Sequence, residues 1–144
     1  MSNDISWQPL KLKAIDDNDL LVFSECIYQA IMLPSEINYE PKQEQFAMAI
    51  ERFTWESAAG KDYNLMQVQS VLIISGVQNI ETKNYLRQNH ISHLISISNI
   101  DNNILILLNK DQIINLRVNK WSCLLRDMGK PYFPAITPSH LKND

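Results

Sequence analysis

The chain has 144 residues, of which 45% are hydrophobic and 20% are charged, and its formal net charge is −3 at pH 7. These proportions are typical of one soluble globular domain, here residues 1–144, and the weakly acidic balance excludes the broad basic surface that nucleic-acid binding needs. No apolar run approaches the roughly 20 residues that cross a bilayer, so we expect no membrane-spanning segment.

The first predicted elements are a short strand and a helix. Leucine and lysine alternate over residues 10–14, which is the period of a half-exposed strand. Asp16 can cap the helix that follows, with Asp19 at the reciprocal position of the first turn. Apolar residues then recur at helical spacing until Pro34, which cannot continue a helix. The predicted apolar face consists of Leu20, Phe23, Ile27, Ala30 and Ile31.

The middle of the chain predicts several strands. Residues 37–39 form a short strand, and residues 45–55 and 66–75 form longer ones. In the last of these, Met66, Val68, Leu72 and Ile74 face one side, and Gln67, Gln69 and Ser75 face the other. Residues 75–88 show no clear period apart from a helical turn at 82–87. A further strand then places Ile91, His93, Ile95 and Ile97 opposite a serine-lined face.

The apolar pattern changes phase within residues 45–55. Phe46, Met48 and Ile50 share one face, but the apolar positions after them are Phe53 and Trp55. A period-2 pattern changes phase where a strand bulges, bends or becomes buried on both faces. We therefore expect a bend here, as in a sheet that curls into a barrel-like roll.

The C-terminal third predicts a hairpin and a helix. Residues 104–108 and 113–118 are apolar segments joined by the turn Asn109-Lys110-Asp111. Asn119 is a good N-cap for a helix over residues 119–128, and Gly129 and Pro131 provide its end. Its apolar face consists of Trp121, Leu124, Leu125 and Met128. The proline-punctuated residues 130–144 form an extended C-terminal tail.

These elements predict an α+β fold. We expect a curved, mostly antiparallel sheet or barrel-like roll of about seven strands, with an N-terminal helix and a C-terminal capping helix. The capping helix makes the arrangement pleckstrin-homology-like by analogy, because a final helix closes the antiparallel roll in those domains.

Three segments together resemble a bacterial family catalogued as a domain of unknown function, number 2948. They are LKAIDDNDLLVFSECIYQAI at residues 12–31, RFTWE at residues 52–56 and CLLRDMGKPYFPAITPSH at residues 123–140. The more specific parts are RFTWE and the D-x-G-x-P exit formed by Asp127, Gly129 and Pro131. The resemblance implies a bacterial, cytoplasmic, single-domain protein and implies no activity.

The candidate binding residues are Arg52, Trp55 and Glu56, which surround the change of phase. In one arrangement Arg52 and Glu56 pair across a bend while Phe53 and Trp55 point inward. In the other, Trp55 lies exposed beside Arg52 as an aromatic and cationic patch of the kind enriched at binding hot spots. The first arrangement is favoured because tryptophan is usually mostly buried.

No other pattern identifies chemistry. His90 and His93 are the only closely spaced histidines, but on a strand their side chains point in different directions, and no Cys or acidic pair completes a metal site. His93 is better explained as a hydrogen-bonded residue in an apolar row. The sequence has no nucleophile elbow and no activated-cysteine signature. We therefore predict no catalytic residues, no metal and no cofactor.

Two functional classes follow from these observations. The first is a non-catalytic binding or scaffolding module that recognises a protein or peptide, by strand addition beside the C-terminal helix or as a homo-oligomer. The second is a small-molecule-binding protein or enzyme with a site in the mouth of the roll, using Arg52, Glu56 or His93. The N-terminus lacks a signal peptide pattern, and Cys26 and Cys123 lack metal or redox spacing, so we expect a cytoplasmic protein without nucleic-acid or membrane partners.

Overall fold

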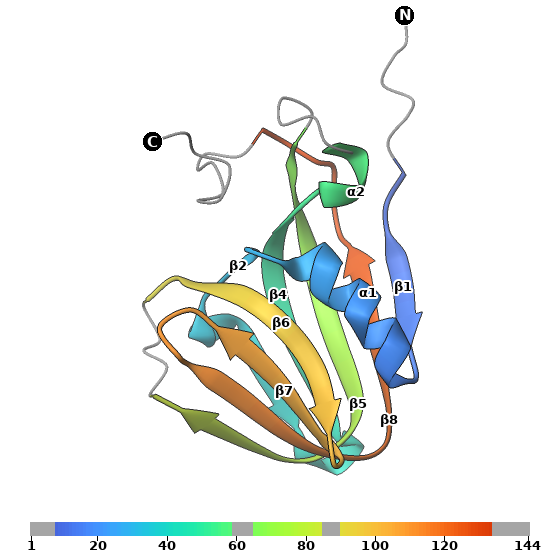
Figure 1. Cartoon of the computed structure of the whole chain (residues 1–144), viewed down its shortest axis with the longest axis vertical. Coiled ribbons are helices and arrows are strands. Elements are labelled where there is room, and N and C mark those ends of the chain that lie inside the picture. Colours follow the sequence, from blue (N-terminus) through green and yellow to red (C-terminus); the bar gives the residue numbers. More distant parts are fainter. Residues whose placement is uncertain (1–7, 59–64, 85–89, 134–144) are drawn as a thin grey trace, which may run out of the picture.

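The structure, a computed structural model, describes residues 8–58, 65–84 and 90–133 (Figure 1). It consists mainly of long antiparallel strands and one N-terminal helix. The elements in order are β1 (Lys11–Ala14), α1 (Asp17–Ile27), β2 (Ile31–Met32), η2 (Pro34–Glu36), β3 (Ile37–Glu40), η3 (Pro41–Gln43), β4 (Gln45–Phe53), α2 (Trp55–Ala58), β5 (Gln67–Lys83), β6 (Ser92–Ile100), β7 (Asn103–Leu108) and β8 (Ile113–Asp127).

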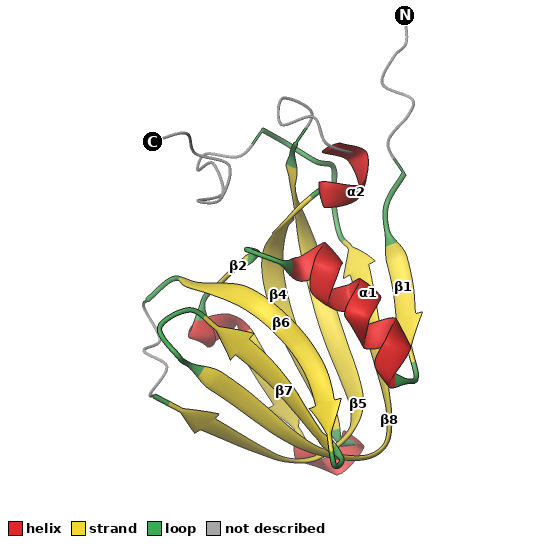
Figure 2. Cartoon of the chain, in the orientation of Figure 1, coloured by secondary structure: helices red, strands yellow, loops and turns green. Residues whose placement is uncertain are grey.

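Six of the eight described strands close into an antiparallel barrel, in the order β8-β5-β4-β2-β6-β7 and back to β8 (Figure 2). The other two strands extend it: β1 pairs with the C-terminal half of β8, and β3 pairs with the first half of β4. The predicted α+β class and curved antiparallel sheet are thereby confirmed.

The interior of the barrel is filled by apolar side chains. Alternate residues of each strand point inward, as in Phe46, Met48 and Ile50 of β4 and Leu72 and Ile74 of β5, all at most 2% exposed. Because each fully buried side chain of this size contributes roughly 1.5–3 kcal/mol, this core is the main source of stability. The outward positions between them carry most of the polar residues.

Helix α1 lies against the barrel between β1 and β6 (Figure 1). The predicted start is confirmed: Asp16 caps the helix by accepting a hydrogen bond from the Asp19 N–H, and the Asp19 carboxylate accepts from the Ile15 N–H. Leu20, Phe23 and Ile27 are buried, as expected. The predicted end is wrong, because Gln29 takes a left-handed conformation (φ 69°) and the chain re-enters the sheet as β2.

The predicted C-terminal helix is wrong. Residues 119–127 belong to strand β8, whose register with β5 pairs Leu125 with Leu72 and Cys123 with Ile74. Cys123 and Leu125 point into the core while Arg126 is exposed, so the same residues fit a period of two. Gly129 has no positive φ and therefore caps no helix. The analogy with pleckstrin-homology-like domains depended on that helix and loses its basis.

The predicted hairpin is confirmed. Strands β7 and β8 pair antiparallel with Ile106 opposite Ile114, and Lys110 and Asp111 both adopt the left-handed conformation that a tight hairpin turn needs. Asp101 and Asn102, which also have positive φ, form the turn between β6 and β7.

Two strand interpretations need correction. A bulge between Leu94 and Ser96 of β6 shifts the inward row to Ser92, Leu94 and Ile97, and Ile91 and Ile95 are exposed. The strand predicted to end near Ser75 instead continues as β5 to Lys83, so the predicted helical turn is wrong at Thr82 and Lys83, and residues 85–87 lie outside the described residues. Gln67, expected outside, is buried.

None of the helices in the described ranges has the length and apolar character needed to span a bilayer.

Candidate functional site

Arg52 lies at the end of β4 and points into the protein. It occupies the same face as Phe46, Met48 and Ile50, so no bulge causes the change of phase. Arg52 takes the next inward position as a fully buried charged side chain, and Phe53 is buried as well because the chain leaves the strand toward α2. The apolar pattern of the sequence does change phase at this position. The cause is the inward-facing Arg52, and not the predicted bend.

The main partner of Arg52 is Asp127 at the end of β8. Nε of Arg52 donates to Oδ1 of Asp127 at 2.8 Å, and Nη2 donates to Oδ2 at 2.9 Å. Both side chains are 0% exposed. This bidentate geometry is the strong form of an arginine–carboxylate pair.

Glu56 in α2 binds the other side of the guanidinium. Nη1 donates to Oε1 of Glu56 at 3.0 Å and Nη2 donates to Oε2 at 2.7 Å, while Nη1 also donates to the Phe53 carbonyl at 3.1 Å. All five N–H groups of Arg52 therefore have an acceptor. Burial by itself lowers the pKa of Arg52, but the two carboxylates outweigh it and raise the pKa above its ordinary value.

Both carboxylate oxygens of Asp127 also accept hydrogen bonds from groups other than Arg52. Its Oδ1 also accepts from the Ser70 hydroxyl at 2.7 Å, and its Oδ2 accepts from the Leu10 N–H at 2.7 Å. Burial favours a higher pKa for Asp127, but the hydrogen bonds from Arg52, Leu10 and Ser70 prevail and lower it. The Arg52 cluster, meaning Arg52, Glu56, Ser70 and Asp127, joins β4, α2, β5 and β8 with its hydrogen bonds directed at one another.

The Arg52 cluster predicts a loss of stability in acid. Because the pKa of Asp127 is lowered in the fold, its ionised form stabilises the protein above the ordinary value of 3.8, and this contribution is lost as the pH falls through the folded pKa. We expect the free energy of unfolding, measured by urea titration between pH 6 and pH 2, to fall more steeply for the wild type than for Asp127→Asn. Equal slopes for the two proteins would contradict the assignment.

Trp55 is half-buried beside the Arg52 cluster. Its ring packs against Phe53 with a centroid distance of 5.7 Å and against Tyr28 with 6.2 Å, and its Nε1 donates to the Tyr28 carbonyl at 2.8 Å. With Phe53 and Leu65 it forms a small apolar cluster separate from the barrel core. The structure therefore contains the Arg52–Glu56 pair of the first predicted arrangement, but the Trp55 side chain is only half-buried.

Trp55→Ala tests the structural role of this ring. We expect a loss of about 2–4 kcal/mol in the free energy of unfolding, because the ring contacts with Phe53 and Tyr28 disappear. Trp55→Phe retains most of the ring packing and removes only the Nε1 hydrogen bond, so its loss is expected to be about 1 kcal/mol. Urea denaturation of both variants measures this, and an unchanged stability of Trp55→Ala would favour an exposed recognition residue instead.

The two histidines do not form a joint site. His93 is half-buried on β6, where its backbone N–H donates to Oδ1 of Asn109 at 3.0 Å, and His90 is exposed before the strand begins. In the described ranges, no three His, Cys, Asp or Glu side chains are close enough to hold a metal ion.

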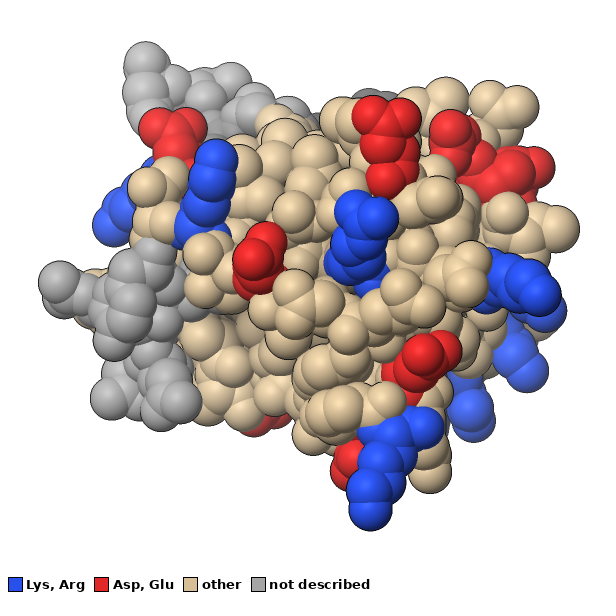
Figure 3. Space-filling view, turned by 90° about the horizontal axis from the view of Figure 1, so that it is seen from below, with Lys and Arg blue, Asp and Glu red and all other residues tan. Residues whose placement is uncertain are grey.

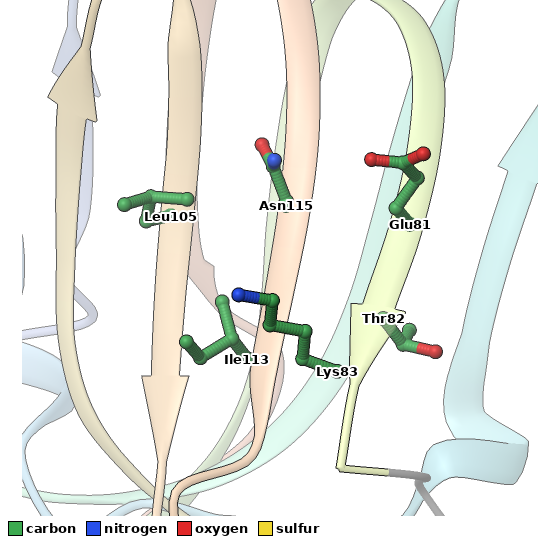
Figure 4. A pocket seen from close by; sticks show the side chains of 6 residues that line it. All are labelled: Glu81, Thr82, Lys83, Leu105, Ile113 and Asn115. Atoms are coloured by element: carbon green, nitrogen blue, oxygen red, sulfur yellow. The ribbon is translucent and has the colours of Figure 1, made fainter.

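Sequence reasoning missed two features. Asp127 lies far along the chain from Arg52, and the only signal for it was its place in the D-x-G-x-P exit of the resemblance. The second is a surface hollow of about 540 Å³ on the outer face of β5, β7 and β8, lined by Glu81, Thr82, Lys83, Leu105, Ile113 and Asn115 (Figure 4). Three of these six residues, Glu81, Thr82 and Lys83, lie within residues 75–88, where the sequence shows no clear hydrophobic period.

The fold and the Arg52 cluster define a class: a small antiparallel β-barrel domain with a packed interior, fastened at one end by a buried arginine. Residues 10–140 match the family model described as Protein of unknown function (DUF2948), and the chain belongs to this family. No curated protein and no solved structure matches it significantly. Arg52, Glu56 and Asp127, which come from the two more specific motifs of the resemblance, meet in one cluster.

Proposed function

We propose that the protein is a small, non-catalytic module that binds a protein or peptide segment by strand addition along the outer edge of β5. In this mode an extended segment joins an exposed sheet edge through backbone hydrogen bonds, and neighbouring side chains give specificity. The proposed site is the β5 edge, defined as residues 78–83, together with the adjoining hollow on the outer face.

The observation that carries the proposal is the length of β5. Its pairing with β4 ends at Ser75, and the Gly76 and Val77 N–H groups then donate to the Glu44 carbonyl. Beyond that point β5 continues along β8 to Lys83, and no described strand pairs with its other side. Figure 1 shows this end of β5 as the outermost strand of the barrel. An edge of this kind is a template for another strand.

A comparison with β6 supports the choice of edge. The Ser24 hydroxyl of α1 donates to the Ile97 carbonyl and accepts from the Ile97 N–H, both at 2.9 Å. Helix α1 thus occupies backbone groups of β6 that β2 does not reach, and it covers that edge. The β5 edge has no such cover among the described residues.

The Arg52 cluster gives less support to the alternative of a small-molecule site in the mouth of the roll. Every N–H of Arg52 already has an acceptor within the protein, so binding an anion there would require breaking the contacts with Asp127 or Glu56. We therefore assign Arg52 and Glu56 to holding α2 and β8 together, with Trp55 packed beside them.

The distribution of charge on the surface bears on whether nucleic acid is a partner. Acidic and basic side chains are interspersed on the face shown in Figure 3, which gives no support to a nucleic-acid partner.

Cys26 and Cys123 are free, and burial raises the pKa of Cys123 to about 12. Unpaired thiols suit a reducing compartment, which supports the proposed location in the cytoplasm.

Site-specific photo-crosslinking in native cells tests the proposed edge. A photoreactive side chain at Thr82, which is exposed and lies within the β5 edge, is expected to crosslink a protein partner. The matched control is Gln69, which is exposed on the same strand but lies where β5 pairs with β4 and its carbonyl accepts from the Met128 N–H. Equal labelling from both positions, or labelling from Gln69 alone, would overturn the proposal.

A further inference from the structure

We infer that the strand added at the β5 edge is the same edge of a second copy of this chain. The inference rests on the proposed function and names its partner. The resulting two-fold dimer would join the two barrels through one continuous antiparallel ladder, with the same surface contributed by each copy.

The sequence of the edge is complementary to itself. In a symmetric antiparallel pair with Thr82 opposite Thr82 of the second copy, Glu81 lies opposite Lys83 and Lys83 lies opposite Glu81. Opposite charges and paired threonines are both favourable as direct cross-strand neighbours. A register centred on Glu81 would instead place two glutamates face to face, which is unfavourable. The charges therefore favour the register centred on Thr82 over the one centred on Glu81.

The side chains stand where this pairing needs them. Glu81 and Lys83 lie on the outer face of β5, because their partners on β8, Asn115 and Ile113, are half-exposed while the intervening Ile114 is buried. Figure 4 shows Glu81 and Lys83 beside the outer-face hollow. Thr82, whose partner on β8 is the buried Ile114, lies on the opposite face of the strand. A second strand would thus meet Thr82 at the centre and one charged residue on each side.

One local feature prepares the edge for pairing. The Asn84 side chain donates to the Asp111 carbonyl, which attaches the end of β5 to the turn between β7 and β8. The edge is therefore held in an extended form before pairing.

The test is a charge exchange measured by sedimentation velocity of the purified full chain over a range of concentrations. We expect a monomer–dimer equilibrium for the wild type. Glu81→Lys alone and Lys83→Glu alone each place like charges opposite one another twice, and are expected to weaken the dimer about tenfold or more. The double variant Glu81→Lys/Lys83→Glu restores both opposite pairs and is expected to recover the wild-type constant within about threefold.

The control is Lys130→Glu, an exposed charge reversal remote in sequence from the edge, which is expected to leave the dimer unchanged. A monomeric wild type at all concentrations, or a double variant no better than the single ones, would overturn the inference. If the purified chain is monomeric and Thr82 still crosslinks another protein in cells, the proposed function stands and only the identity of the partner is wrong. If neither experiment gives a product at the edge, both proposals fail.

Discussion

Replacing Arg52 with alanine is expected to lower the free energy of unfolding by about 3–5 kcal/mol, because it leaves the Asp127 carboxylate buried without its cationic partner. Asp127 keeps the hydrogen bonds from Ser70 and Leu10, but these do not neutralise its charge. The same change removes the guanidinium that joins α2 to β8. Urea denaturation followed by circular dichroism measures the loss, provided that the slope with denaturant is unchanged.

Two further variants separate charge from packing. Glu56→Gln alters only the partly exposed end of the cluster, where the glutamate side chain is 39% exposed, and is expected to change stability by less than about 1 kcal/mol. The double variant Arg52→Met/Asp127→Leu removes both buried charges and is expected to be more stable than Arg52→Ala. A loss below about 1 kcal/mol for Arg52→Ala would contradict the stabilising role of the cluster.

Gly76→Ala is expected to destabilise the protein by at least about 3 kcal/mol, because the new methyl group has no space and the backbone disfavours it. Gly76 has φ +86°, and a Cβ there would lie 2.5 Å from the Asn119 carbonyl oxygen and 3.0 Å from that of Lys120. These atoms belong to the backbone of β8, where the ladder with β5 is irregular. They cannot move aside without disturbing the pairing of both strands.

Gly129→Ala is the matched control for Gly76→Ala. A Cβ at Gly129 meets nothing within 4 Å, and its φ is not positive. The substitution is expected to change stability by no more than about 0.5 kcal/mol. Thermal unfolding of both variants compares them directly, and similar midpoints would show that the close approach of β5 and β8 is not needed.

Arg52 and Asp127 show which part of the candidate site the sequence could predict and which part it could not. Arg52 and Glu56 are close in sequence, and their pairing was one of two arrangements that the local pattern allowed. Asp127 is 75 residues from Arg52, and no periodicity relates them. Only closure of the barrel, with β5 paired to both β4 and β8, brings the two ends together. The binding role of Arg52, Trp55 and Glu56 stays a prediction.

The sequence by itself determined the features that depend on neighbouring residues. The Asp16 cap, the apolar face of α1, the tight turn at Lys110 and Asp111 and the antiparallel sheet class all follow from local hydrogen bonding and side-chain spacing. Residues 119–128 are different, because their apolar positions fit both a helical face and an alternating strand. The tertiary structure decided between them: as a strand, this segment gains hydrogen bonds from β5 on one side and β1 on the other, and this pairing outweighs its helical preference.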